Sequence, residues 1–133
     1  MKEYIITCNL NRFNLIEHFK STPCVMWKQV KNCSVGDIVY VYVGRPYSKL
    51  FYKCLVTQAD IILSDSEMQK HNYLRNENKD RKYMTLEMKS TLNVEGLDLQ
   101  SLFAHGLKTV QCSTEINESL ESYIKRILKE GGY

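Results

Sequence analysis

The sequence predicts a mixed α+β domain, in which a small curved sheet of mostly antiparallel strands, or a pseudo-barrel, has helices packed outside it. Three observations lead to this prediction. Segments with strand periodicity alternate with helical segments, residues 38–43 form a continuous run of β-branched and aromatic residues, and residues 115–129 have one apolar helical face. The chain has 133 residues, of which 44% are apolar, so we expect one domain spanning residues 1–133.

The N-terminal part of the chain predicts one strand and one helix. Apolar and polar residues alternate over 3–8, which indicates the first strand. Residues 9–11, Asn-Leu-Asn, are typical of a turn and can also cap a helix. Apolar residues then recur at helical spacing over 13–20. Residues 24–34 show no such periodicity, so we expect an irregular segment around Trp27, the only tryptophan.

The middle of the chain contains the strongest strand signal. Both faces of a strand over 38–43 would be bulky, so we expect other elements to cover both of them. A loop over 44–48 leads into a further strand near 50–58. Residues 64–82 are polar and charged, and predict a long surface loop with one helical turn near 67–70.

The last third of the chain predicts a strand followed by two helices. Alternation returns over 83–91, and a short helix is expected over 97–103. Val110 is expected in a short strand. The amphipathic segment 115–129 predicts the last helix, and the glycines at 131–132 end it.

Composition excludes several classes of protein. The charged share of 25% is ordinary for a soluble domain, and no apolar run approaches the roughly 20 residues that span a membrane. The first residues do not have the layout of a signal peptide. We therefore expect a cytoplasmic protein without a membrane partner.

The cysteines and histidines do not predict a metal site. Five cysteines occur, an odd number, and no two have the CxxC spacing. The three histidines are far apart and pair with no cysteine at zinc spacing. Small buried thiols are the interpretation we favour, and we expect no metal and no cofactor.

The basic residues are concentrated in the first half of the chain. Residues 1–54 contain eight Lys and Arg against three acids, a net charge of +5, whereas residues 55–133 contain ten against twelve, a net of −2. Such an imbalance favours an anionic partner that contacts one face, although a solvated surface with chance imbalance remains the alternative. The candidate phosphate-binding residues are Arg12, Lys28, Lys31, Arg45 and Lys49.

Several segments resemble one known family when they are taken together. The most specific combination is Trp27, the Val-Gly-Asp at 35–37 before the central strand, and the Pro-Tyr-Ser at 46–48. The similar segments are 4–9, 12–16, 27–29, 35–49, 52–54, 105–108 and 110–111. They resemble bacterial EVE domains of the PUA-like superfamily, which are related to YTH and ASCH domains. Relatives often have Gly-Pro after the late glutamine, where this chain has Cys112-Ser113.

The resemblance implies a PUA-like pseudo-barrel of mostly antiparallel strands with helices packed outside, and a pocket on its surface. In EVE and YTH domains this pocket is thought to hold a modified base between aromatic side chains. Extracting a base from a duplex costs a few kcal/mol, and stacking on an aromatic ring returns about 1–3 kcal/mol per base.

The aromatic and amide residues provide candidates for such a pocket. We expect Trp27 to form one stacking wall and Tyr42 or Tyr47 to form the other. The candidates for recognising the base edge are Asn9, Asn32, Ser48 and Gln111, whose side chains can donate and accept hydrogen bonds. Core packing of the aromatic rings, and a turn or helix cap at Asn9, are the alternatives.

The leading hypothesis is a non-catalytic module that holds a flipped, modified base, most plausibly a modified cytosine in DNA. One alternative is an RNA-binding PUA-like protein, and another is a small ASCH-like enzyme acting on nucleic acid or nucleosides. Against an enzyme, no histidine stands beside a nucleophile in the sequence, although folding could still create a Cys-His pair. A protein-interaction module is a further alternative. Because relatives are thought to occur beside defence genes, a separate effector such as a nuclease is a possible partner.

Overall fold

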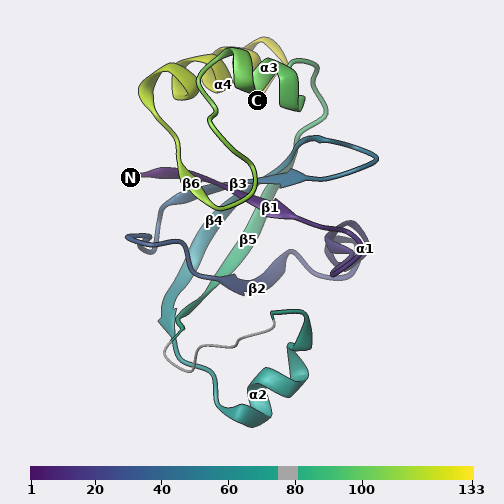
Figure 1. The fold of residues 1–133 in the computed structure, drawn as a ribbon, viewed down its shortest axis with the longest axis vertical. Coiled ribbons are helices and arrows are strands. Elements are labelled where there is room, and N and C mark those ends of the chain that lie inside the picture. Colours follow the sequence, from purple (N-terminus) through teal and green to yellow (C-terminus); the bar gives the residue numbers. More distant parts are fainter. Residues whose placement is uncertain (75–80) are drawn as a thin grey trace.

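A six-stranded sheet forms the centre of the molecule, with the strand order β2-β5-β4-β3-β1-β6 (Figure 1). The structure is a computed structural model that describes residues 1–74 and 81–133. The strands are β1 (Glu3–Cys8), β2 (Cys24–Lys28), β3 (Ile38–Val43), β4 (Lys49–Ile61), β5 (Tyr83–Thr91) and β6 (Thr114–Glu115). The pair β1–β3 is parallel and the other pairs are antiparallel, so the predicted mixed fold with mostly antiparallel strands is confirmed.

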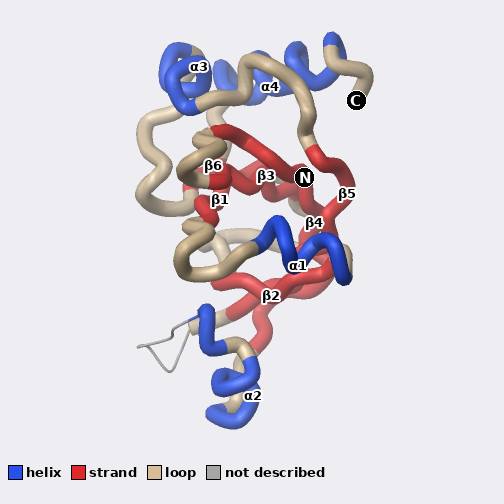
Figure 2. Tube along the Cα trace, turned by 90° about the vertical axis from the view of Figure 1, so that its right-hand side faces the viewer, coloured by secondary structure: helices blue, strands red, loops and turns tan. Residues whose placement is uncertain are grey.

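The described residues also form four helices and one 3₁₀ turn, which pack outside the sheet. They are α1 (Leu15–Ser21), α2 (Asp65–Lys70), the 3₁₀ turn η1 (Asn72–Leu74), α3 (Leu99–Ala104) and α4 (Glu118–Glu130). Helices α3 and α4 lie together over one end of the sheet, whereas α2 lies at the opposite end (Figures 1 and 2). No helix in the described residues has the length and apolarity needed to cross a bilayer.

Strand β3 separates two hydrophobic clusters, as its two bulky faces predicted. Val39, Val41 and Val43 belong to the cluster that α1 covers through Leu15. The alternate residues of β3, Ile38, Tyr40 and Tyr42, belong to the second cluster, which contains the apolar faces of α3 and α4. Because side chains alternate across a strand, a single strand with two apolar faces holds both clusters together.

Each of the four helices begins at a polar cap. Asn14, Ser64, Asp98 and Asn117 each accept a hydrogen bond from a main-chain N–H in the first helical turn. Asn9 does not cap α1. Its side chain accepts a hydrogen bond from the N–H of Asn11 at 2.9 Å, which makes the turn that the Asn-Leu-Asn sequence also allowed.

Two parts of the sequence-based description were wrong, and a third was right in part. The segment 24–28 is not irregular but forms β2, which pairs with β5 along its whole length. Backbone pairing with the neighbouring strand stabilises an edge strand of this kind more than alternation of apolar and polar residues does. Val110 lies outside any strand, because the short strand is β6 at 114–115. The helical turn expected near 67–70 is confirmed by α2, but η1 follows it where only loop was expected. Residues 75–80 of that predicted loop lie outside the described residues.

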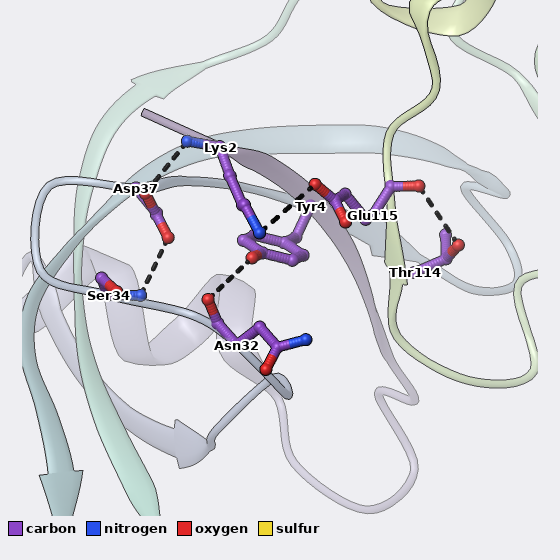
Figure 3. A network of polar contacts seen from close by, with 7 residues as sticks. All are labelled: Lys2, Tyr4, Asn32, Ser34, Asp37, Thr114 and Glu115. Atoms are coloured by element: carbon purple, nitrogen blue, oxygen red, sulfur yellow. Dashed lines mark hydrogen bonds and ion pairs between the residues drawn. The ribbon is translucent and has the colours of Figure 1, made fainter.

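A buried carboxylate connects the start of the chain to the turn before β3 (Figure 3). Asp37 is only 6% exposed, and it accepts the N–H of Lys2 at 3.0 Å and the N–H of Ser34 at 2.8 Å. Beside it, the Tyr4 hydroxyl donates to the Asn32 carbonyl at 3.1 Å. These contacts fix the end of β1 that lies away from the candidate site.

The five cysteines are all free thiols, and three of them, Cys8, Cys33 and Cys54, are buried. Burial raises the pKa of the Cys54 thiol to about 12 and that of the Cys8 thiol to about 11. Such thiols are inert packing groups at neutral pH. Cys24 and Cys112 are exposed.

Candidate functional site

A cavity of about 340 Å³ opens between β1 and the edge strand β2. These strands are far apart in the strand order, and one cavity contacts both of them, so the sheet curves back toward itself at this place. Five stretches of the described chain line the cavity: 6–13 around the end of β1, 27–29 at the end of β2, 73–74, residue 81, and 111–113. The volume falls within the range of roughly 300–1,000 Å³ that is usual for small-molecule sites.

Three aromatic rings meet at the cavity. Trp27 is half-buried on β2, on the same face as the buried Val25 and two residues beyond it. Phe13, in the segment before α1, meets Trp27 edge-on at a centroid distance of 6.0 Å. Tyr73, from η1, lies 6.3 Å from Trp27 at an interplanar angle of 44°.

The rings do not form the slot of two parallel walls that the sequence-based hypothesis described. Such a slot requires rings about 7 Å apart, which is twice the van der Waals separation. Phe13 and Tyr73 are already stacked on each other at 4.1 Å, and Trp27 is inclined to both of them. A planar ligand would therefore stack on Trp27, and the Phe13–Tyr73 pair would form the adjoining wall.

The polar side chains of the cavity are cations and amides. Arg12, Lys28 and Arg81 line it, and within the described residues no acidic side chain does so. Asn9 and Gln111 also line the cavity and are exposed. Since the side-chain Oδ1 of Asn9 already accepts from the N–H of Asn11, the side-chain amide N–H groups of Asn9 are the part that can point to a ligand.

A contact between β1 and the loop before β6 shapes another part of the cavity wall. The Thr7 hydroxyl donates to the Val110 carbonyl at 2.5 Å, and this contact holds the loop 110–113 against the end of β1. Strand β6 pairs with β1 only at Tyr4 and Ile5, so the ladder stops before Thr7 reaches the cavity. The edge of β1 beyond that point lines the cavity instead of pairing with a strand.

Of the residues predicted for the base pocket, the structure brings Trp27, Asn9 and Gln111 to this cavity. Tyr42 is not there. It is 4% exposed and points to the face of β3 that packs against α3 and α4, because it alternates with Val41 and Val43. The proposed role of Tyr42 as a stacking wall is therefore wrong.

The other predicted pocket residues also lie elsewhere. Tyr47 is 45% exposed and rests edge-on against the ring of Phe51 at 5.1 Å. Ser48 lies in the same loop, where its carbonyl accepts from the N–H of Leu99 at 3.1 Å. Asn32 lies in a neighbouring hollow on the far side of Gln29. None of the three lines the cavity.

The candidate phosphate-binding residues divide into two groups. Arg12 and Lys28 line the cavity, and Lys31 lines the neighbouring hollow. Arg45 is exposed in the loop after β3, and the ammonium of Lys49 lies over the Phe51 ring at 5.5 Å. Neither Arg45 nor Lys49 contacts the cavity.

Sequence reasoning missed Phe13, Tyr73 and Arg81. Phe13 has helical spacing with later apolar residues, so it was interpreted as part of a helix face rather than as a cavity wall. Tyr73 and Arg81 fall in the polar segment interpreted as a surface loop. An isolated aromatic residue within such a segment was the one available signal. In the described residues, no group of three or more His, Cys, Asp or Glu side chains is placed to hold a metal ion.

Comparison with known proteins establishes the fold class. No family model matches the chain, and no curated protein matches it. A solved structure of ASCH from Zymomonas mobilis has a TM-score of 0.62 at 13% identity, covering 95% of each chain. A protein from Pseudomonas putida has a TM-score of 0.67 at 11% identity, covering 94% of this chain and 98% of that one.

A third neighbour is the N-terminal domain of McrB from Thermococcus gammatolerans, solved bound to m5C DNA. It has a TM-score of 0.56 at 15% identity and covers 100% of both chains. At these identities the likeness shows a shared PUA-like fold alone. None of the three neighbours is named as an EVE domain, so membership of that particular family stays a prediction.

Proposed function

We propose that this chain binds nucleic acid and holds one extruded, modified base, a modified cytosine in DNA, in the cavity between β1 and β2. The observation that carries the proposal is the composition of the cavity wall. Three aromatic side chains, Phe13, Trp27 and Tyr73, stand beside three cations, Arg12, Lys28 and Arg81. Aromatic rings contribute about 1–3 kcal/mol per stacked base, and cations hold the phosphates on either side of it.

The chemistry of each side chain determines the role that we assign to it in the site. Trp27 offers its exposed area for stacking. The Asn9 amide N–H groups can donate to the edge of a base, and the Gln111 amide can both donate to it and accept from it. Arg12, Lys28 and Arg81 contact phosphates, which orients the strand without reading its sequence. A methyl group on the base would add about 0.8 kcal/mol if it is fully buried against the rings.

The likeness to the McrB domain supports the choice of ligand, because that protein was solved with m5C DNA. The fold neighbours named ASCH keep open the alternatives of RNA and of a small enzyme acting on nucleic acid or nucleosides. We propose a binding role rather than catalysis, since the wall of the cavity combines stacking and phosphate-binding groups. A separate effector protein would then act on the bound nucleic acid.

A binding panel tests the proposal. It compares oligonucleotides that contain 5-methylcytosine, 5-hydroxymethylcytosine, N6-methyladenine or no modification, each prepared as DNA and as RNA. The proposal predicts the tightest binding for a modified cytosine in DNA. Equal affinity for all members of the panel would remove the modified base from the account, and tighter binding of the RNA series would select the RNA alternative.

A further inference from the structure

A second hollow adjoins the cavity and shares part of its wall. It has a volume of about 590 Å³ and is lined on one side by residues 30–33, which follow β2. Gln29, Arg81 and Ser113 line both the hollow and the cavity, so the two adjoin at these residues. A ligand that fills the cavity can thus continue into the hollow without leaving the protein surface.

The charges of this hollow favour an anion. Lys31, Arg81 and Lys82 line it, and Asp60 is the single acid among its described lining residues. The Lys82 ammonium lies 3.4 Å from a carboxylate oxygen of Asp60, so this pair is largely neutral. Lys31 and Arg81 leave a net positive charge, and both are exposed.

Gln29 is held in a fixed position in the partition, by which we mean the side chains of Gln29, Arg81 and Ser113 between the cavity and the hollow. Its amide nitrogen donates to a carboxylate oxygen of Asp60 at 3.0 Å, and its amide oxygen accepts the N–H of Asp60 at 2.5 Å. Asp60 has a φ of +57°, an uncommon conformation for a residue other than glycine, and it presents both groups to Gln29. The boundary between the cavity and the hollow is therefore a preformed part of the structure, because both the nitrogen and the oxygen of the Gln29 amide are held by Asp60.

We infer that the hollow is a phosphate subsite, which holds the phosphodiester next to the base in the cavity, so that the ligand is a polynucleotide strand rather than a free nucleoside or mononucleotide. This inference rests on the proposed function for the location of the base. Arg81 contacts the nucleic-acid strand where it passes from the cavity to the hollow, and Lys31 contacts the part of the strand that lies in the hollow. Asp60 weakens phosphate binding in the subsite because its carboxylate forms an ion pair with Lys82.

Salt dependence of binding tests the subsite. The probe is a single-stranded DNA heptamer with a central 5-methylcytosine, and the same heptamer with cytosine, titrated over a range of NaCl concentrations. Each lost phosphate contact reduces the slope of log K against log salt by about 0.7 for a single strand. Lys31→Ala and Arg81→Ala should each reduce the slope by about that amount for both heptamers, and Lys129→Ala, on α4, should not change it.

Removing the negative charge of Asp60 should change binding in the opposite direction. Asp60→Asn keeps an oxygen for the Gln29 amide and its own N–H, but it releases Lys82. Both heptamers should bind more tightly, and the slope should increase by about 0.7. Weaker binding by Asp60→Asn, or unchanged slopes in Lys31→Ala and Arg81→Ala, would overturn the subsite.

The same titrations separate the subsite from the proposed function. The affinity ratio of the two heptamers for the unaltered protein tests recognition of the modified base, whereas the slopes test the subsite. If the two heptamers bind with equal affinity, but the salt slopes still change in Lys31→Ala and Arg81→Ala, only the recognition of the modified base would be overturned. As competitor, 5-methyl-2′-deoxycytidine monophosphate should displace the heptamer poorly, and a mononucleotide that binds as tightly as the heptamer would overturn the assignment to a strand.

Discussion

The rings of Phe13 and Tyr73 are stacked at a centroid distance of 4.1 Å, with an angle of 20° between their planes. Phe13 precedes α1, whereas Tyr73 comes from η1, so the contact joins two segments that are 60 positions apart in the chain. The Tyr73 hydroxyl donates to the Met26 carbonyl at 3.0 Å, which ties the pair to β2 beside Trp27. The aromatic part of the cavity wall is thus assembled from three separate parts of the sequence.

Two substitutions of Tyr73 should separate its hydroxyl from its ring. Tyr73→Phe removes the hydrogen bond to Met26 and should lower the free energy of unfolding by about 1 kcal/mol, while heptamer binding stays close to that of the unaltered protein. Tyr73→Ala also removes the stacked ring, and should weaken binding of the 5-methylcytosine heptamer. Urea denaturation and fluorescence anisotropy measure the two effects. Tighter binding by Tyr73→Ala would mean that the ring obstructs the site instead of forming its wall.

Alkylation of the exposed cysteines gives a footprint of the cavity without any substitution. Cys8, Cys33 and Cys54 should resist iodoacetamide, because they are buried and burial raises their thiol pKa values. Cys112 lines the cavity and Cys24 does not, although both are exposed. Bound heptamer should therefore slow the labelling of Cys112 but not of Cys24, as peptide mass spectrometry can show. Equal labelling of Cys112 with and without ligand would place the nucleic acid elsewhere.

The buried carboxylate of Asp37 should contribute to stability and not to binding. Asp37→Asn leaves one of the two N–H donors, of Lys2 or Ser34, facing an amide N–H, and should cost about 1–3 kcal/mol of unfolding free energy. Glu95→Gln, at an exposed position, is the matched control and should leave stability unchanged. Denaturation midpoints measure the difference. Equal midpoints for the two variants would mean that Asp37 does not hold the start of the chain.

Periodicity was sufficient for the elements that carry the core. The alternation of β3 predicted two covered faces, and the spacing of apolar residues predicted α1 and α4 within a few positions. Strand β2 was missed, because five residues at a sheet edge show little alternation and are fixed by pairing with β5. The candidate site was predicted only in part, because it too depends on contacts between segments that are distant in the sequence. Trp27, Asn9 and Gln111 could be selected by residue type, but the sequence does not reveal that Tyr73 and Arg81 fold back to them.

The proposal of a binding module predicts no catalysis. Purified protein should leave labelled DNA and RNA intact, with and without Mg²⁺, because we assign the groups of the cavity to stacking and phosphate contacts. Gel electrophoresis after prolonged incubation measures this. Cleavage that copurifies with the protein, and that is lost in Arg12→Ala or Cys112→Ala, would favour the enzyme alternative.

The affinity of Trp27→Ala for the 5-methylcytosine heptamer and for unmodified duplex DNA tests the central claim most directly. Trp27 is half-buried beside the cavity, so its removal should abolish stacking while the cations keep their phosphate contacts. Circular dichroism and a denaturation curve confirm that the variant is folded before binding is compared. We predict a loss of about 1–3 kcal/mol for the 5-methylcytosine heptamer and a much smaller loss for unmodified duplex DNA. Equal losses for both ligands in a folded variant would contradict the account, because Trp27 would then support the domain and would not hold a base.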